Sequence, residues 1–182
     1  MIPVLKKLYT DSIVPELIKT RGYKNRHQVP VLQKIVINSG VNSSLDKNAA
    51  EETAAQIAAI TGQKPVITKS KKSIANFKLR EGLPIGVKVT LRGPIMYHFF
   101  YKLVSIALPA IRDFRGVPVK MDGHGNYTLG ITDHTIFPEV TIDSIKRTMG
   151  MDITFVTSAK TDEECTELLK MLGMPFRKRE KI

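Results

Sequence analysis

The chain has 182 residues, of which 42% are hydrophobic, so it can form a buried core and does not belong to the compositionally disordered class. Its formal net charge of +11 favours a polyanionic partner, meaning nucleic acid or an anionic membrane surface. No stretch approaches the roughly 20 apolar residues that cross a bilayer, and a lone cysteine, Cys165, excludes an internal disulfide and a cysteine-based zinc site.

The length favours one domain over two, so we expect residues 1–182 to form a single domain. The N-terminal sequence has no signal-peptide pattern and cysteine is nearly absent, which is typical of a reducing, cytosol-like compartment. The positive charge is uneven. Residues 1–100 carry 16 Lys and Arg against 6 Asp and Glu, whereas residues 101–182 carry 12 against 11. We therefore expect the anion contact mainly in the first half.

The predicted elements begin with a helix over residues 2–20 and a strand over residues 31–38. The first segment, IPVLKKLYTDSIVPELIKT, has apolar residues at helical spacing, and Pro15 predicts an interruption. The second, VLQKIVIN, is rich in β-branched residues, which is typical of a strand. The helix residues expected in the core are Leu5, Leu8, Leu17 and Ile18.

An Ala-rich helix and a short strand follow. The helix, DKNAAEETAAQIAAITG (46–62), has two candidate N-caps, Asp46 and Asn48, and Gly62 predicts its C-terminal end. The strand, KPVITK (64–69), precedes a strongly basic segment.

The segment VKVTLRG (87–93) alternates between apolar and polar residues, which predicts a strand with two different faces. The apolar face carries Val87, Val89 and Leu91, and the polar face carries Lys88, Thr90 and Arg92. Residues 94–114 carry the clearest helical pattern, with Pro94 in the first turn and a kink or end expected at Pro109. The apolar residues at helical spacing are Met96, Phe99, Phe100, Leu103, Ala107 and Ile111.

The second half predicts one loop, two strands and one further helix. They cover residues 116–125, 126–132, 151–159 and 161–173 in that order. Thr161 with Glu164 three residues later is a capping box, and Gly173 predicts the end of the helix. The basic tail, residues 177–182, is expected to fray.

These elements indicate an α+β fold, with an antiparallel or mixed sheet, helices packed on one face and a protruding basic loop at about residues 69–82. The apolar face of residues 87–93 would meet the helices and leave its polar face for solvent or a partner. In residues 31–38, Lys34 and Asn38 lie on one side, opposite two isoleucines.

Residues 64–80 carry six basic residues and no acidic residue. Because the segment lies between two predicted strands, it can project as a hairpin loop. Its Lys and Arg would bind phosphate through counterion release without reading sequence. A solvated loop without a partner is the alternative. The basic residues are Lys64, Lys69, Lys71, Lys72, Lys78 and Arg80, and Ser70, Ser73 and Asn76 can hydrogen-bond phosphate or ribose.

A broad polar strand face with a basic loop suits structured RNA better than the DNA major groove, because no basic recognition helix is evident. A DNA-binding or membrane-surface module is the alternative. A basic helix-turn-helix would favour DNA and a basic amphipathic helix would favour a membrane, and the sequence contains neither pattern.

Motifs for catalysis are weak. The histidines lack metal-ligand spacing. Asp122 with His124, and Asp133 with His134, place a carboxylate near an imidazole, but such pairs are typical of polar turns. Cys165 lies among carboxylates, which disfavour a reactive thiolate. We therefore expect no enzyme, cofactor, metal or small-molecule substrate; a clustered His–carboxylate or Cys–His group in a pocket would favour the alternative.

Several long motifs resemble the bacterial ribosomal protein five family of the large subunit. The longest is GQKPVITKSKKSIANFKLREGLPIGVKVTLRG (62–93), and the others are IRDFRGV, DGHGNYTLGI, IFPE, GMDITFVTSAKTDEE and GMPF. With QVPVLQKIVINSGV near the start, the similarity covers essentially the whole chain.

The resemblance implies an antiparallel sheet with helices on one side. It also implies a structural protein that binds 5S rRNA, helps to anchor it in the central protuberance and contacts other large-subunit rRNA. Contacts with tRNA in the peptidyl site, and an intersubunit bridge to a protein of the small-subunit head, are implied as well. The implied location is the cytoplasmic ribosome, with an organellar ribosome as the alternative.

The resemblance further implies three sets of contact residues. For 5S rRNA, Asn38, Gln63 and Thr90 match family positions, and Lys34, Lys88 and Arg92 lie on the same predicted strand faces. The loop that meets tRNA matches Lys69, Lys71, Lys72, Ser73, Asn76, Phe77, Lys78 and Arg80. The bridge matches residues 111–137, with Arg112, Arg115 and His124 as candidate contacts; His124 stands where the family usually has Arg.

Overall fold

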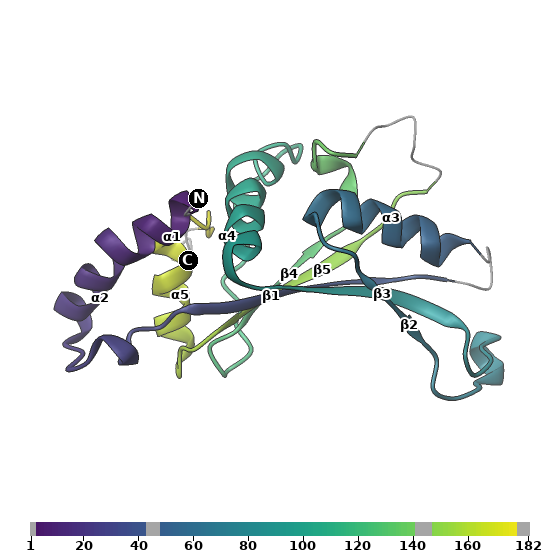
Figure 1. The fold of residues 1–182 in the computed structure, drawn as a ribbon, viewed down its shortest axis with the longest axis horizontal. Coiled ribbons are helices and arrows are strands. Elements are labelled where there is room, and N and C mark those ends of the chain that lie inside the picture. The colour runs from purple at the N-terminus through teal and green to yellow at the C-terminus, as the bar shows by residue number, and fades with distance from the viewer. Residues whose placement is uncertain (1–2, 43–47, 141–146, 178–182) are drawn as a thin grey trace, which may run out of the picture. The chain divides into compact units, whose positions relative to one another are not determined.

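The structure is a computed structural model that describes residues 3–42, 48–140 and 147–177 (Figure 1). Its strands form an antiparallel five-stranded sheet in the order β2-β3-β1-β5-β4, which confirms the predicted α+β class. The strands are β1 (Leu32–Gly40), β2 (Val66–Lys69), β3 (Pro84–Leu91), β4 (Tyr127–Ile131) and β5 (Met151–Thr157). The helices are α1 (Val4–Leu8), α2 (Val14–Arg21), α3 (Ala49–Thr61), α4 (Gly93–Lys102) and α5 (Asp162–Met171).

The chain divides into two compact units. The first unit comprises Met1–Ile35, Arg92–Leu129 and Thr154–Ile182, and the second comprises Val36–Leu91 and Gly130–Ile153. Strand β1 contributes residues to both units. The expectation of a single domain therefore stays a prediction.

In the second unit, α3 packs against β2 and β3 (Figure 1). The helix follows Asn48 and ends at Gly62, whose left-handed backbone, with a φ of +72°, is a common way for a helix to stop. Asp46, the other candidate N-cap, lies outside the described residues. On β3 the buried residues Val87 and Val89 alternate with exposed Lys88, so the polar side chains of the strand point away from α3.

The first unit has an aromatic core. Phe100 of α4 meets Phe155 of β5 edge to face with ring centroids 5.5 Å apart, and Tyr127 of β4 stacks on Phe155 at 6.0 Å. Helix α1 also contacts α4. Such aromatic pairs are worth about 0.5–1.5 kcal/mol each beyond the area that they bury.

Two widened helical turns precede prolines in the first unit. A π turn at Tyr9–Ile13 comes before Pro15, and another at Leu103–Ala107 comes before Pro109. Proline lacks an N–H and its ring crowds the carbonyl four residues earlier, and a π turn relieves both problems by shifting the bonding to i→i−5. The interruption near Pro15 is thus confirmed, and the helix ends around Pro109 as expected.

The π turns explain where the predicted core residues differ. Leu5 and Leu17 are buried, but Leu8 is exposed and Ile18 is only half-buried. A π turn holds more residues than an α turn, so the helical spacing that relates Leu8 to Leu17 does not continue through it. Ile111, beyond the second π turn, is half-buried and no longer helical.

Helix α5 confirms half of the predicted capping box. Thr161 Oγ1 accepts a hydrogen bond from the Glu164 N–H at 3.4 Å. In a full capping box the Glu164 carboxylate would accept from the Thr161 N–H. It accepts instead from the N–H of the preceding residue, Lys160, at 3.0 Å. At the predicted frayed tail, the Arg177 N–H donates to the Val117 carbonyl, and residues 178–182 lie outside the described residues.

Candidate nucleic-acid interface

The basic arm, residues 69–82, joins β2 to β3 and extends past the ends of both strands (Figure 1). Its backbone is closed by its own hydrogen bonds. Ile74 and Leu79 exchange two of them, at 2.9 and 3.1 Å, and Ser70 donates to the Leu83 carbonyl at 2.8 Å. The arm is therefore a structured hairpin extension and not a loose loop.

The candidate tRNA-contacting side chains of the arm are all exposed. Phe77 is 72% exposed at the tip, which is unusual for a large apolar side chain. Lys78 adopts a left-handed backbone with φ of +52°, a conformation that costs a non-glycine residue free energy. Within the part of the chain that the structure describes, the cations of the arm form no ion pair. The exposed residues are Lys69, Lys71, Lys72, Ser73, Asn76, Phe77, Lys78 and Arg80.

Two serines of the arm serve its own structure. Ser70 is buried, and its hydroxyl donates to the Lys72 carbonyl at 2.7 Å. It is therefore not available to phosphate, contrary to the sequence-based expectation. Ser73 Oγ accepts from the Glu81 N–H at 3.0 Å, which leaves its hydroxyl proton free to donate outward.

The second unit also presents a polar face, which we define by Asn38, Thr68, Lys88, Thr90 and Asp152. Asn38, Lys88, Thr90 and Asp152 each have buried neighbours on both sides in their strands, so their side chains point to the opposite face from the core. Thr68 of β2 pairs with Gly86 of β3, two residues before Lys88, and so lies on the same face. Asn38 and Lys88 are exposed and Thr90 is half-buried. Their side chains make no hydrogen bond or ion pair to any described residue, so their polar atoms are open to a partner.

Gln63 is fixed beside this polar face. Its side-chain Nε2 donates to the Thr90 carbonyl at 3.1 Å, which leaves the Gln63 amide oxygen as a free acceptor. The structure thus brings together Gln63 and Thr90, two residues 27 positions apart that were assigned to one surface.

The remaining candidate cations for 5S rRNA, Lys34 and Arg92, belong to the first unit. Lys34 is half-buried on β1. Arg92 is exposed and is the extended residue that directly precedes α4. Both are unpaired within the described segments.

A hollow of about 480 Å³ opens at one end of the polar face. Its lining includes three glycines, Gly40, Gly130 and Gly150, beside the polar side chains of Asn38 and Asp152. The sequence reasoning missed this hollow. A glycine inside a predicted strand, as at Gly130, was the pattern that could have indicated it.

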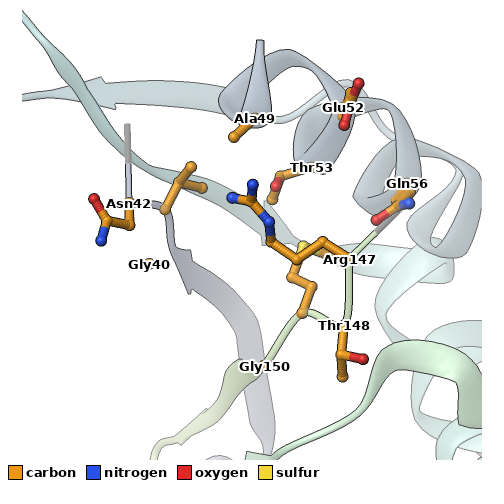
Figure 2. A pocket seen from close by; sticks show the side chains of 11 residues that line it. Gly40, Asn42, Ala49, Glu52, Thr53, Gln56, Arg147, Thr148 and Gly150 are labelled. Atoms are coloured by element: carbon orange, nitrogen blue, oxygen red, sulfur yellow. The ribbon is translucent and has the colours of Figure 1, made fainter. Parts of the chain in front are cut away.

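A second hollow, of about 240 Å³, lies between the N-terminal half of α3 and the segment that leads into β5. Figure 2 shows the Arg147 side chain directed into it, toward Ala49 and Thr53 of α3. Gln56 and Thr148 add further polar groups to the lining. Its mixed lining has no nucleophile with an adjacent base, so it does not resemble a catalytic centre.

The candidate bridge residues Arg112, Arg115 and His124 are all exposed. His124 is at the tip of a tight loop. The Asp122 carboxylate accepts hydrogen bonds from the Asn126 side-chain amide at 2.7 Å and from the N–H groups of Asn126 at 2.9 Å and His124 at 2.8 Å. These bonds, led by the one from the Asn126 side chain, lower the pKa of Asp122. The hydrogen bonds that Asp122 accepts therefore shape the turn, and the His124 imidazole has only the smallest of the effects on the Asp122 pKa.

The other weak catalytic candidates are structural. His134 is fully buried, its Nδ1 accepts from the Met149 N–H at 3.2 Å, and burial lowers its pKa. Burial also raises the pKa of the Cys165 thiol to about 11, with smaller contributions from Asp162 and Asp122. A reactive thiolate is thus disfavoured, as expected, and burial contributes more to this than the acidic neighbours do.

The described residues contain neither a cluster of metal-ligand side chains nor a membrane-spanning helix. No group of three or more His, Cys, Asp and Glu side chains in residues 3–42, 48–140 and 147–177 could hold a metal ion. In the same residues, no helix has the length and apolar composition needed to cross a membrane.

Two family models match the chain. The model described as "Ribosomal protein L5" matches residues 25–80, and "ribosomal L5P family C-terminus" matches residues 84–176. Curated relatives named "Large ribosomal subunit protein uL5" are similar over nearly the whole length. The protein of Protochlamydia amoebophila is 59% identical over 174 residues, covering 95% of this chain and 94% of its own. Those of Dictyoglomus thermophilum and Thermotoga maritima are 56% and 53% identical, each covering 96% of this chain and 99% and 96% of their own.

Proposed function

Because the chain belongs to the ribosomal protein L5 family, we propose that it binds 5S rRNA in the large ribosomal subunit through the polar face of its second unit. The protein is a structural constituent of the large subunit and not an enzyme, and it resides in the ribosome. In this role it helps to anchor 5S rRNA in the central protuberance and also contacts neighbouring large-subunit rRNA.

One observation carries the proposal. The polar face presents Asn38, Lys88 and Thr90 with no partner among the described residues, on the side of β3 that α3 does not cover. Short polar side chains held on strands have few rotamers to lose on binding, so they suit a flat, structured RNA surface. Lys88 adds a cation for phosphate.

The basic arm supports a second contact, with tRNA in the peptidyl site. Its cations are exposed and unpaired within the described segments, and its hairpin extends beyond the strands that carry it. A hairpin with internal hydrogen bonds holds its charges in a defined arrangement, so less ordering entropy is lost on binding.

The loop around His124 supports the third contact, an intersubunit bridge to a protein of the small-subunit head. Its backbone is fixed from a second element, because the Asp162 carboxylate accepts from the N–H groups of Gly123 at 3.2 Å and Gly125 at 3.1 Å. A fixed loop with an exposed side chain at its tip suits a protein partner. Arg112 and Arg115 would add exposed cations to the same contact.

The binding of 5S rRNA can be tested with Thr90→Val, which keeps the side-chain shape and removes the hydroxyl, and with Asn38→Ala. Each change should weaken binding of a bacterial 5S rRNA transcript by about 1–3 kcal/mol, because a buried polar partner is left unpaired. Filter binding at fixed salt measures the dissociation constant. Thr20→Val, at an exposed position of α2 in the first unit, is the matched control.

Two outcomes would contradict the proposal at different levels. If the parent protein does not bind 5S rRNA above its affinity for an unrelated RNA, the assigned partner is wrong. If the parent binds and both variants bind equally well, the partner stands and the assigned face is wrong.

A further inference from the structure

Two glycines beside the hollow on the polar face are not required by the fold. Gly40 ends β1 and Gly130 lies within β4, and neither has a φ in the left-handed region. A Cβ on Gly40 would meet nothing within 4 Å, and one on Gly130 would make only an ordinary 3.5 Å contact with Asp152 Oδ1. Glycine in a strand nevertheless costs about 0.5–1 kcal/mol relative to alanine.

A strand glycine that packing and backbone do not need marks a place where a ligand approaches closely. Without side chains at Gly40, Gly130 and Gly150, the hollow reaches about 480 Å³. A flat ring can therefore enter it and lie against the backbone.

The carboxylate at the border of the hollow limits the chemistry of that ligand. Asp152 is exposed and has no hydrogen-bond or ion-pair partner in the described part of the chain. A phosphate group would be repelled by this carboxylate, so the group that enters must present hydrogen-bond donors. In RNA the donors available to a protein are base edges and ribose hydroxyls.

Guanine is the base whose Watson–Crick edge offers two adjacent donors, N1–H and the N2 amino group, to the two oxygens of one carboxylate. Adenine and cytosine place a ring acceptor beside their amino group, and uracil places its N–H between two carbonyls. We infer that Asp152, with Gly40, Gly130 and Asn38, forms a pocket for one unpaired guanine of the bound RNA, an inference that rests on the proposed binding of 5S rRNA.

Asn38 completes the recognition in this assignment. Its amide borders the same hollow and carries two N–H donors, which suit the O6 acceptor next to guanine N1. The pocket thus adds base selectivity to a surface whose other groups bind backbone.

The inference can be tested by removing the negative charge of Asp152 and measuring whether RNA binding becomes weaker or tighter. Asp152→Asn keeps the shape but replaces one acceptor with an amino group that faces the guanine donors. Binding of a bacterial 5S rRNA transcript should weaken on the order of 10-fold or more. Glu51→Gln, an exposed position on α3, makes the same charge change elsewhere and should leave binding unchanged or slightly tighter. If Asp152→Asn binds as tightly as Glu51→Gln does, Asp152 reads no base.

Filling the hollow tests the role of the glycines. Gly40→Ala and Gly130→Ala should leave the melting temperature unchanged or raise it, because the new methyl groups fit and the unfolded chain loses freedom. Each should still weaken binding of the 5S rRNA transcript several-fold. Unchanged binding by both well-folded variants would overturn the inference.

Inosine lacks only the N2 amino group and identifies the base directly. In an interference experiment with inosine scattered through the transcript, the parent protein should select against inosine at one unpaired position, and Asp152→Asn should lose that selection while keeping the rest of the profile. An identical profile for both proteins would overturn the inference and leave the proposed function intact. Failure of the parent to bind the transcript would instead overturn the proposed function.

Discussion

Gly123 and Gly125 share one loop and one backbone conformation but differ in their surroundings. Their φ values are +84° and +74°, in the region that side chains disfavour. A Cβ on Gly123 would meet nothing within 4 Å, whereas one on Gly125 would lie 2.5 Å from the Ala159 carbonyl oxygen. The two glycines therefore separate the cost of conformation from the cost of a clash.

We expect Gly123→Ala to lower the free energy of unfolding by about 1–2 kcal/mol, the cost of a left-handed residue with a side chain. Gly125→Ala should cost clearly more, because the backbone must also move away from Ala159. Urea denaturation of both variants measures the difference. Equal losses would mean that the loop moves freely and that the 2.5 Å approach does not restrain it.

Glu164 shows how one carboxylate can join two elements of the first unit. It accepts hydrogen bonds from the Tyr23 hydroxyl at 2.7 Å and from the Lys160 N–H at 3.0 Å. These bonds, led by the one from Tyr23, lower the pKa of Glu164 below its ordinary value. The charged form is therefore favoured in the folded state, and its contribution to stability is lost as the pH falls through the folded-state pKa.

Glu164→Gln should lower the free energy of unfolding at pH 7 by about 1 kcal/mol, because the remaining bonds are to a neutral acceptor. The difference from the parent should shrink as the pH falls from the ordinary pKa of a glutamate through the lower folded-state pKa of Glu164, because the parent carboxylate is then neutral as well. Glu163→Gln is the control, since Glu163 is 83% exposed in a 3.6 Å ion pair with Arg21. A difference that stays constant with pH would show that the Glu164 charge is unimportant.

The basic arm is held by hydrogen bonds that do not involve its lysine side chains, so its charge can be changed without changing its fold. Lys69, Lys71 and Lys72 are exposed, and the hydrogen bonds that close the hairpin use backbone groups and serine side chains. Neutralising the three lysines should therefore leave the hairpin intact.

Replacement of all three lysines by Gln should reduce the slope of log K against log salt for tRNA bound at the peptidyl site by about two to three, because fewer counterions are released. Replacement by Arg should preserve the slope. Titrations of ribosomes that contain each variant provide the measurement. The control is a variant in which Lys6, Lys7 and Lys19, all exposed in the first unit, are replaced by Gln, because it loses the same number of positive charges. The same slope for the arm variant and the control would mean that the arm is only a solvated surface.

The whole chain combines two compact units that share β1, whose first residues belong to one unit and whose last residues belong to the other. If either unit unfolded alone, part of β1 would lose its neighbours and leave backbone groups unpaired. This physical cost supports the expectation of a single cooperative domain.

We accordingly expect one unfolding transition, with a calorimetric enthalpy equal to the van't Hoff enthalpy. Circular dichroism and the fluorescence of probes placed separately in each unit should give the same midpoint. Two resolved transitions would show that the units are independent domains.

Local patterns were sufficient for most elements of this protein. The alternation in residues 87–93 predicted the two faces of β3, and Gly62 and Gly173 predicted the ends of α3 and α5, because period and capping depend on neighbours in the chain. The long motifs were likewise sufficient to indicate the family. The π turns before Pro15 and Pro109 were predicted only as interruptions, since proline breaks the bonding pattern without specifying what replaces it.

Contacts between distant residues depended on the folded chain. Periodicity placed Thr90 and Asn38 on strand faces, but it could not give the bond from Gln63 to the Thr90 carbonyl or the burial of Ser70. The hollow beside Asp152 is the clearest example, because its lining comes from three strands that are far apart in sequence. Strand order and register arise from packing over the whole sheet, and a single residue of slip would move each side chain to the opposite face.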